Sequence, residues 1–164
     1  MAYHGLCHET VPDPYQVQSR IAWQPKLFDG DGTWRKKIDH SRFIALLTER
    51  FPEVAANIDD CSQGLLHLEM ATLARATQAA IDGQDKPTVL RHFKFIDEVF
   101  RDAAPDVENA VNVSYLENLR FEGRNAGPAR ARELLTPKLR QALSELEEYL
   151  ERLFSEAERR RKGA

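Results

Sequence analysis

Helical periodicity dominates this sequence from Asp39 almost to its C-terminus. Apolar residues recur there at intervals of three and four, which is the spacing of residues along one face of an α-helix. Breaks in the pattern, each marked by proline or glycine, occur at Pro52, "DGQDKP", Pro105, "GRNAGP" and Pro137. The spacing therefore predicts a mainly α fold, a single-domain helical bundle of about five to seven helices over residues 39–162.

The composition fits one soluble globular domain. The chain has 164 residues, of which 42% are hydrophobic and 30% are charged. A chain of that length can bury a core without help from disulfides or a metal. No apolar run is long enough to cross a bilayer, so we expect no membrane partner.

The charge and the cysteines indicate the partners and the compartment. A net charge of -3 leaves no broad basic surface for a phosphate backbone, so nucleic acid is an unlikely partner. The basic cluster "ERRRK" ends the last predicted helix, where cations complement the helix dipole. The two cysteines, Cys7 and Cys61, form no disulfide framework, and the start of the chain lacks the pattern of a signal peptide. These features predict a cytoplasmic protein with free thiols.

Residues 1–38 differ in amino-acid composition from the rest of the chain. Prolines break any helix there, and the segment is too rich in aromatic residues for a free tail. We expect an irregular arm that packs on the helical body, with room for a short hairpin across the "DGDG" turn. Tyrosine and tryptophan often anchor protein interfaces, so the candidate partner contacts are Tyr15, Trp23 and Trp34. The alternative is that these side chains only cover the bundle.

The stretch "DVENAVNVSYLENLRFEG", residues 106–123, combines a helical pattern with many polar groups. At about 100° per residue it is apolar on nearly every face, which predicts a central, buried helix. An unpaired buried amide costs roughly 1–3 kcal/mol, so the polar side chains need partners. We expect Ser114, Glu117 and Asn118 to form a core network, in which Ser114 bonds a carbonyl one turn back. The alternative is a polar pocket or interface notch that they line with Arg120.

The last predicted helix, residues 137–162, follows Thr136 as its expected N-cap. Its apolar residues alternate spacings of four and three, as in a coiled-coil seam. The seam consists of Leu139, Leu143, Leu146, Leu150, Leu153 and Ala157. Tyr149 and Phe154 widen it into a core-facing stripe, so the favoured interpretation is that the helix packs into its own bundle. The alternative is a homodimer, a homo-oligomeric structural module, through residues 139–157.

The sequence contains no recognised catalytic motif. "HGLCHE" offers two histidines and a cysteine, but a structural zinc site usually needs a second close ligand pair, and none follows. "DGDGTW" starts like a calcium loop and then lacks the required glycine and the final glutamate. We therefore predict no catalytic residue, no metal and no cofactor. The alternative is an enzyme or a metal-binding helical protein whose site would be formed by His67, Glu69, His92, Glu117 and Asn118.

Four segments carry a family resemblance: "LLTERFPEV", "GLLHLEMATLARAT", "DVENAVNVSYLENL" and "ELLTPKL". Through them the chain resembles an uncharacterised family of small helical bacterial proteins, over about residues 40–140. The resemblance implies a helical fold and brings no established activity. Helical proteins of this size without a catalytic signature are similar to immunity proteins, which neutralise a partner toxin. We therefore predict a non-enzymatic, protein-binding module of the immunity or antitoxin type.

Overall fold

The computed structural model describes residues 37–122 and 126–162 of the chain. Most of the predicted arm, its hairpin and the "HGLCHE" cluster lie outside these residues. The three candidate partner contacts, Tyr15, Trp23 and Trp34, lie outside them as well. The described part of the compact unit Arg35–Ala164 consists of seven α-helices and one π-helical segment. This architecture confirms the predicted mainly α bundle.

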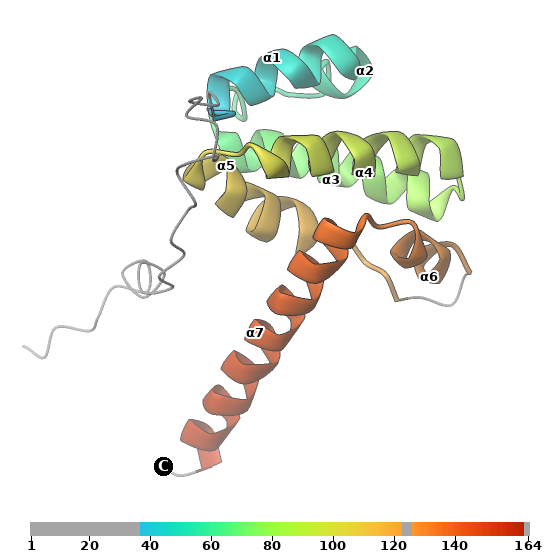
Figure 1. Ribbon diagram of the computed structural model, residues 1–164. Coiled ribbons are helices and arrows are strands. Elements are labelled where there is room, and N and C mark those ends of the chain that lie inside the picture. Colours follow the sequence, from blue (N-terminus) through green and yellow to red (C-terminus); the bar gives the residue numbers. More distant parts are fainter. Residues whose placement is uncertain (1–36, 123–125, 163–164) are drawn as a thin grey trace, which may run out of the picture. The chain divides into compact units, whose positions relative to one another are not determined.

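Helix α1 (His40–Arg50) and the short helix α2 (Pro52–Ala55) form an outer layer, drawn at the top of Figure 1. Asp39 caps α1, because its carboxylate accepts a hydrogen bond from Arg42 N at 2.8 Å. Pro52 opens α2, where its missing N–H costs nothing because the first amides of a helix lack intrahelical partners. Pro52 therefore marks the boundary between α1 and α2, and both helices belong to the same outer layer.

Helices α3 (Leu66–Asp82) and α4 (Lys86–Arg101) form the central layer beneath α1 and α2. A tight turn joins them, in which Gln84 has a positive φ of 56°. Asp85 then caps α4 by accepting a hydrogen bond from Thr88 N at 3.3 Å. Helix α4 shows the general spacing of three and four, and the stripe that this spacing forms is buried along its length; it consists of Val89, His92, Phe93, Ile96, Val99 and Phe100.

The stretch that begins at Pro105 is not one regular helix. Helix α5 (Pro105–Ala110) continues directly into the π-helical segment η2 (Val111–Leu116). At the end of this segment Glu117 N donates to Asn112 O, five residues back, at 3.1 Å. The prediction of one regular helix over residues 106–123 is therefore wrong, because the α-helix ends at Ala110, the π segment ends at Leu116 and residues 117–122 are not helical. The predicted burial is confirmed for most of the helical part, including Val107, Val111 and Tyr115.

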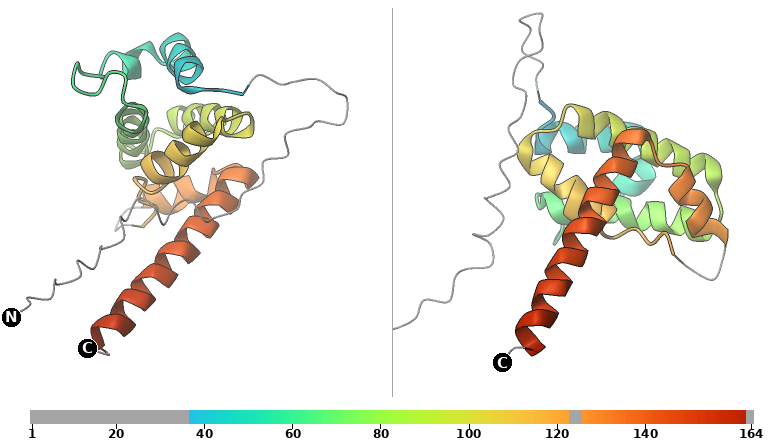
Figure 2. Two further views of the ribbon diagram at one scale, coloured as in Figure 1. Left: turned by 90° about the vertical axis from the view of Figure 1, so that its left-hand side faces the viewer. Right: turned by 60° about the horizontal axis from the view of Figure 1, so that its bottom comes forward.

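The last two helices are α6 (Ala126–Glu133) and α7 (Pro137–Lys162). Helix α6 packs on α3, and the first turns of α7 pack on α4 and η2. Figures 1 and 2 show that α7 then runs away from the other helices of its unit. With 26 residues, α7 is about 39 Å long at the rise of an α-helix.

The core lies on both faces of the central layer. On the side of α1, Phe51 packs edge-on against Phe95 and His92, with ring centroids 5.2 and 4.8 Å apart. On the other side, η2 and the first turns of α7 bury Tyr115, Leu116 and Leu139. Among the described helices, none combines the length and the apolar character that a membrane crossing requires.

Candidate functional site

Ser114 is buried in the π segment, with 7% of its surface exposed, and it bonds to His67 on α3. Its Oγ lies 2.6 Å from His67 Nδ1 and makes no hydrogen bond to the carbonyl one turn back that we expected. Asn118 Nδ2 donates to Ser114 O at 3.1 Å, but Asn118 and Glu117 are both exposed. The predicted core network is therefore wrong for these two residues, because the π turn places them past the edge of the core.

A surface cleft of about 450 Å³ contains three of the four residues that we considered for a polar notch. Glu117, Asn118 and Arg120 line it opposite Arg75 and Gln78 of α3. Gln78 Oε1 accepts a hydrogen bond from Arg120 N at 2.8 Å, which fixes the chain after η2 to α3. The cleft is lined by no histidine, cysteine or hydroxyl group, so its described residues offer a polar surface and no nucleophile.

His92 belongs to a buried network with Thr77 and Tyr115. Thr77 Oγ1 donates to Leu73 O at 2.9 Å. Because a hydroxyl has one proton, the same oxygen accepts from His92 Nδ1–H at 3.0 Å and from Tyr115 O–H at 3.1 Å. Burial and the neighbouring Arg91 lower the pKa of His92 to about 4, so the ring is neutral at neutral pH. This histidine is a structural residue of the core.

Glu69 makes a separate buried contact near the start of α3, where 2% of its surface is exposed. Its carboxylate pairs with His40 Nε2 on α1 and accepts a hydrogen bond from Gly64 N at 2.8 Å. The contact ties α3, the turn before it and α1 together. Both carboxylate oxygens are used in holding these elements.

The five residues proposed for an enzyme or metal site do not come together in one place. His67 and Thr77, the partner of His92, are ten residues apart on α3, which is about 15 Å along the helix. His67 contacts η2, whereas Glu69 contacts α1. Within residues 37–122 and 126–162, no group of three or more His, Cys, Asp or Glu side chains could hold a metal ion.

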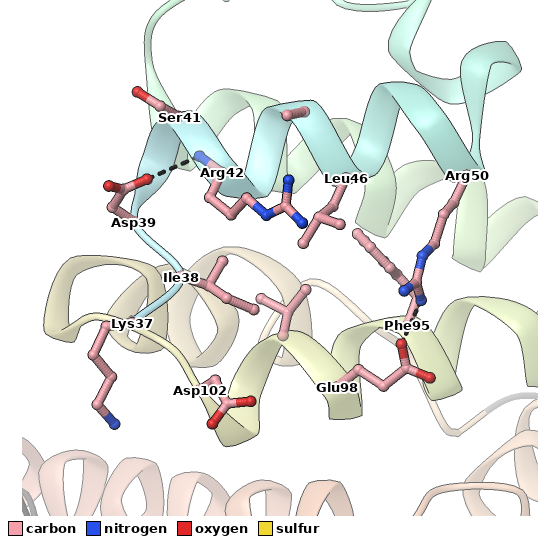
Figure 3. Close-up of a pocket in the computed structure, with 12 residues that line it drawn as sticks. Lys37, Ile38, Asp39, Ser41, Arg42, Leu46, Arg50, Phe95, Glu98 and Asp102 are labelled. Carbon is pink, nitrogen blue, oxygen red and sulfur yellow. Dashed lines mark hydrogen bonds and ion pairs between the residues drawn. The ribbon is translucent and has the colours of Figure 1, made fainter. Parts of the chain in front are cut away.

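A cavity of about 870 Å³ lies between α1 and α4, and Figure 3 shows its lining. Arg50 of α1 pairs with Glu98 of α4 at one end of it. Phe95, Val99 and Leu46 supply apolar surface between the charged groups. Neither histidine nor cysteine occurs among its described lining residues, so the cavity offers mixed polar and apolar surface without a specific chemistry.

Two side chains at the start of α7, those of the N-cap residue Thr136 and of Lys138, anchor the helix to α4. Thr136 Oγ1 accepts from Leu139 N at 3.3 Å, which confirms the predicted N-cap, and donates to the buried Asp97 at 2.5 Å. Lys138 Nζ donates to Phe100 O at 2.9 Å and lies 4.5 Å from the centroid of the Phe100 ring. Burial lowers the pKa of Lys138, as expected for an ammonium group held against the protein. These contacts fix the direction in which α7 leaves the body.

Beyond its second turn, α7 leaves the core. Leu139, Ala142 and Leu143 are buried, whereas every residue from 151 to 162 is exposed. We call residues 146–162 the outer half of α7. We call its apolar face the outer stripe, which consists of Leu146, Tyr149, Leu150, Leu153, Phe154 and Ala157. The favoured prediction, that the whole helix packs into its own bundle, is wrong for residues 151–162, which are all exposed, whereas Leu146 still packs against the core.

The exposed end of the outer stripe is the feature that the sequence pattern did not reveal. The spacing placed Phe154 on a core-facing stripe, yet 71% of its surface is exposed, and Leu153 is 43% exposed. Periodicity identifies an apolar face but carries no information on what covers it. The contact between Ser114 and His67 was also missed, because 47 residues separate the two along the chain.

Comparison with known proteins supports a family assignment. No curated protein and no solved structure gives a significant match to the chain. The predicted resemblance to a family without an established function is confirmed by a family match that covers more than half of the sequence. The matched family is described as a domain of unknown function, DUF7674; it covers residues 44–154, and the protein belongs to this family.

Proposed function

We propose that this chain is a non-enzymatic protein-binding module and that the outer half of α7 is its binding surface. The proposal depends on one observation: the apolar face of α7 continues from the core into solvent, where Leu153 and Phe154 are exposed. An amphipathic helix with an uncovered apolar face is suited to pack on a partner helix or in a partner's groove. The family match extends to residue 154, so the stripe up to Phe154 lies within the family domain.

The energetics of an isolated helix support this proposal. Residues 151–162 make about three turns that do not pack on another of the described helices, and isolated helices of that length are marginal in water. The ion pair between Lys162 and Glu158, at 3.5 Å, is at the surface. Such pairs contribute about 0–1 kcal/mol. Complete burial of such a side chain from full exposure contributes about 1.5–3 kcal/mol, and a partner that covered Leu153 and Phe154 would add the share that corresponds to their exposed surface.

The type of partner and the compartment are parts of the same proposal. An immunity or antitoxin role, with a toxin as the partner, is supported by the small helical fold. A cytoplasmic location is supported by Cys61, an exposed cysteine with a free thiol, because such thiols persist in reducing compartments. Tyr15, Trp23 and Trp34 stay predicted as further partner contacts.

Site-specific photo-crosslinking in the host cell tests the binding surface. The full chain carries p-benzoylphenylalanine in place of Phe154, and adducts are purified under denaturing conditions and identified by mass spectrometry. The control carries the same amino acid in place of Leu90 on α4, an exposed hydrophobic residue outside the outer stripe, of which 42% is exposed. We expect a discrete protein adduct at position 154 and none at position 90. No adduct at 154, or equal adducts at both positions, would contradict the proposal.

A further inference from the structure

The outer half of α7 carries two separate blocks of charge. Residues 146–151 contain three glutamates and no basic residue, whereas residues 159–162 are three arginines and a lysine. The two blocks therefore have formal charges of -3 and +4 and lie at opposite ends of the outer half. If a second copy of this helix runs in the opposite direction, each acidic block lies beside a basic block. In a parallel pair, like charges would lie side by side.

The apolar centre of the helix coincides with the centre of this charge pattern. Glu147, Phe154 and Arg161 are spaced by seven residues, and seven residues turn an α-helix by about 700°, close to two full turns. The three side chains therefore lie along one edge of the outer stripe, with Phe154 midway between the two charges. A two-fold axis at Phe154 would bring each Glu147 to the Arg161 of the other copy.

The geometry points to a second copy of this chain as the partner, with the outer halves of two α7 helices paired antiparallel about Phe154. This inference rests on the proposed function, because it names the occupant of the same surface. In the pair, Phe154 packs near the same side chain of the other copy, and Glu147 faces Arg161 of the partner subunit. Leu150, Leu153 and Ala157 complete the apolar contact between the helices.

The anchored end of α7 also favours the antiparallel direction. Leu139 and Leu143 lie on the same stripe and are already buried against the body of their own chain. In a parallel pair, the packed helices α1–α6 of both copies would lie at that end and would occupy the same space beside the two α7 helices. In an antiparallel pair, the C-terminus of the second α7 lies there instead, and the packed helices of the two copies lie at opposite ends of the pair.

Glu147 remains available for this contact. Its Oε2 accepts from Arg132 Nη2 of α6 at 2.6 Å, and 41% of the Glu147 side chain is exposed. A carboxylate has about four acceptor positions, so it can bind two guanidinium groups at once. The ion pair with Arg132 orients Glu147 along the edge where the partner's Arg161 would arrive.

Light scattering on the purified full chain tests the pairing. We expect a concentration-dependent rise from the monomer mass of 18.8 kDa to twice that value in the micromolar range. L153D and F154D should remain at the monomer mass, while L90D, which places the same charge on an equally exposed leucine, should still dimerise. All three positions are at the surface, and circular dichroism checks that each variant is folded. A wild-type chain that stays monomeric up to half-millimolar concentration would overturn the inference, and so would dimers of L153D and F154D.

Charge exchange tests the direction of the pair. R161E places two acidic groups opposite each other at both ends of an antiparallel dimer, so we expect roughly tenfold weaker association from two surface ion pairs. Exchange of both charges, E147R with R161E, should restore the dissociation constant to within about threefold of wild type. E156R with R161E is the control, because a parallel coiled coil would place Arg161 opposite Glu156. Restoration by this second exchange, and not by the first, would overturn the antiparallel arrangement.

The mass measurement and the crosslinking experiment separate this inference from the function it rests on. An adduct between two copies of the chain at position 154 supports both. An adduct to a different protein, combined with a monomeric purified chain, supports protein binding and overturns self-pairing. A monomeric chain without an adduct at position 154 overturns both.

Discussion

The hydroxyl of Tyr115 donates its proton to Thr77 Oγ1 at 3.1 Å in the centre of the core, although 38 residues separate the two. Burial raises the pKa of Tyr115, so the hydroxyl keeps this proton. Thr77 also accepts from His92, so replacement of Thr77 by valine leaves two buried donors without a partner. We expect T77V to lower the free energy of unfolding by about 2–5 kcal/mol. Y115F, which removes one donor and leaves none unpaired, should cost only about 0.5–1.5 kcal/mol. Urea denaturation measures both, and equal losses would contradict the network.

His92 should make the stability of the protein depend on pH. Burial and Arg91 lower its pKa in the folded state from 6.5 to about 4. As the pH falls below 6.5, the unfolded chain takes up a proton that the folded chain does not, so stability is lost between pH 6.5 and about 4. The full loss amounts to about 3 kcal/mol.

The control for this pH dependence is H92N, whose amide can still donate toward Thr77 but does not titrate. Urea unfolding at several pH values between neutral and pH 4 gives the change in the free energy of unfolding per pH unit for each protein. This change should be larger for the wild type than for H92N. Identical changes would show that His92 is not the responsible group.

Most of the helices could be predicted from the sequence because their ends carry local signals. Thr136 is a cap in the structure as in the prediction, Asp39 caps α1, and Pro105, which marks a break in the pattern, opens its helix. These signals act within one turn of the chain, so they are readable without tertiary information. The buried stripe of α4 was readable for a similar reason, since its spacing follows a regular α-helix throughout.

Glu69 should be important for the position of α1. Its buried carboxylate pairs with His40 and accepts from Gly64 N. E69Q keeps the volume and removes the charge, so we expect a loss of about 1–3 kcal/mol in the free energy of unfolding. E98Q, which removes the surface partner of Arg50, should change stability by less than about 1 kcal/mol. Thermal and urea unfolding of both variants measure the difference, and a larger loss for E98Q would contradict the assignment.

Thr136 should determine how firmly α7 is attached. T136A removes the acceptor for Leu139 N and the donor to Asp97, so we expect a loss of about 1–2 kcal/mol. In T136A, amide hydrogen exchange in the first turns of α7 should become faster than in the wild type, and this increase should be larger than any increase in α3. S41A, at an exposed position of α1, is the control and should leave exchange in α7 unchanged. Unaltered protection of α7 in T136A would show that the cap does not hold the helix.

The candidate site was harder to predict than the fold, because its features depend on what lies beyond one helix. The outer stripe follows from the spacing of leucines, but its exposure depends on where the other helices end. A regular rotation of 100° per residue predicts Glu117 and Asn118 in a core network, but the chain forms a π turn over Val111–Leu116, and both residues are exposed. The pairing of Ser114 with His67 joins distant segments, and no local pattern records it.

The π segment has a consequence for how this chain tolerates changes in length. Its hydrogen bond from Glu117 N to Asn112 O spans five residues, so the segment accommodates one residue more than an α-helical turn would. If the segment kept all its residues but formed an α-helical turn, every following side chain would be rotated by about 100°. Deletion of a single residue between Val111 and Leu116 would instead let the α-helix of α5 continue with the following side chains in nearly their present directions. The segment therefore takes up one residue without passing a change of helical register on to the chain that follows.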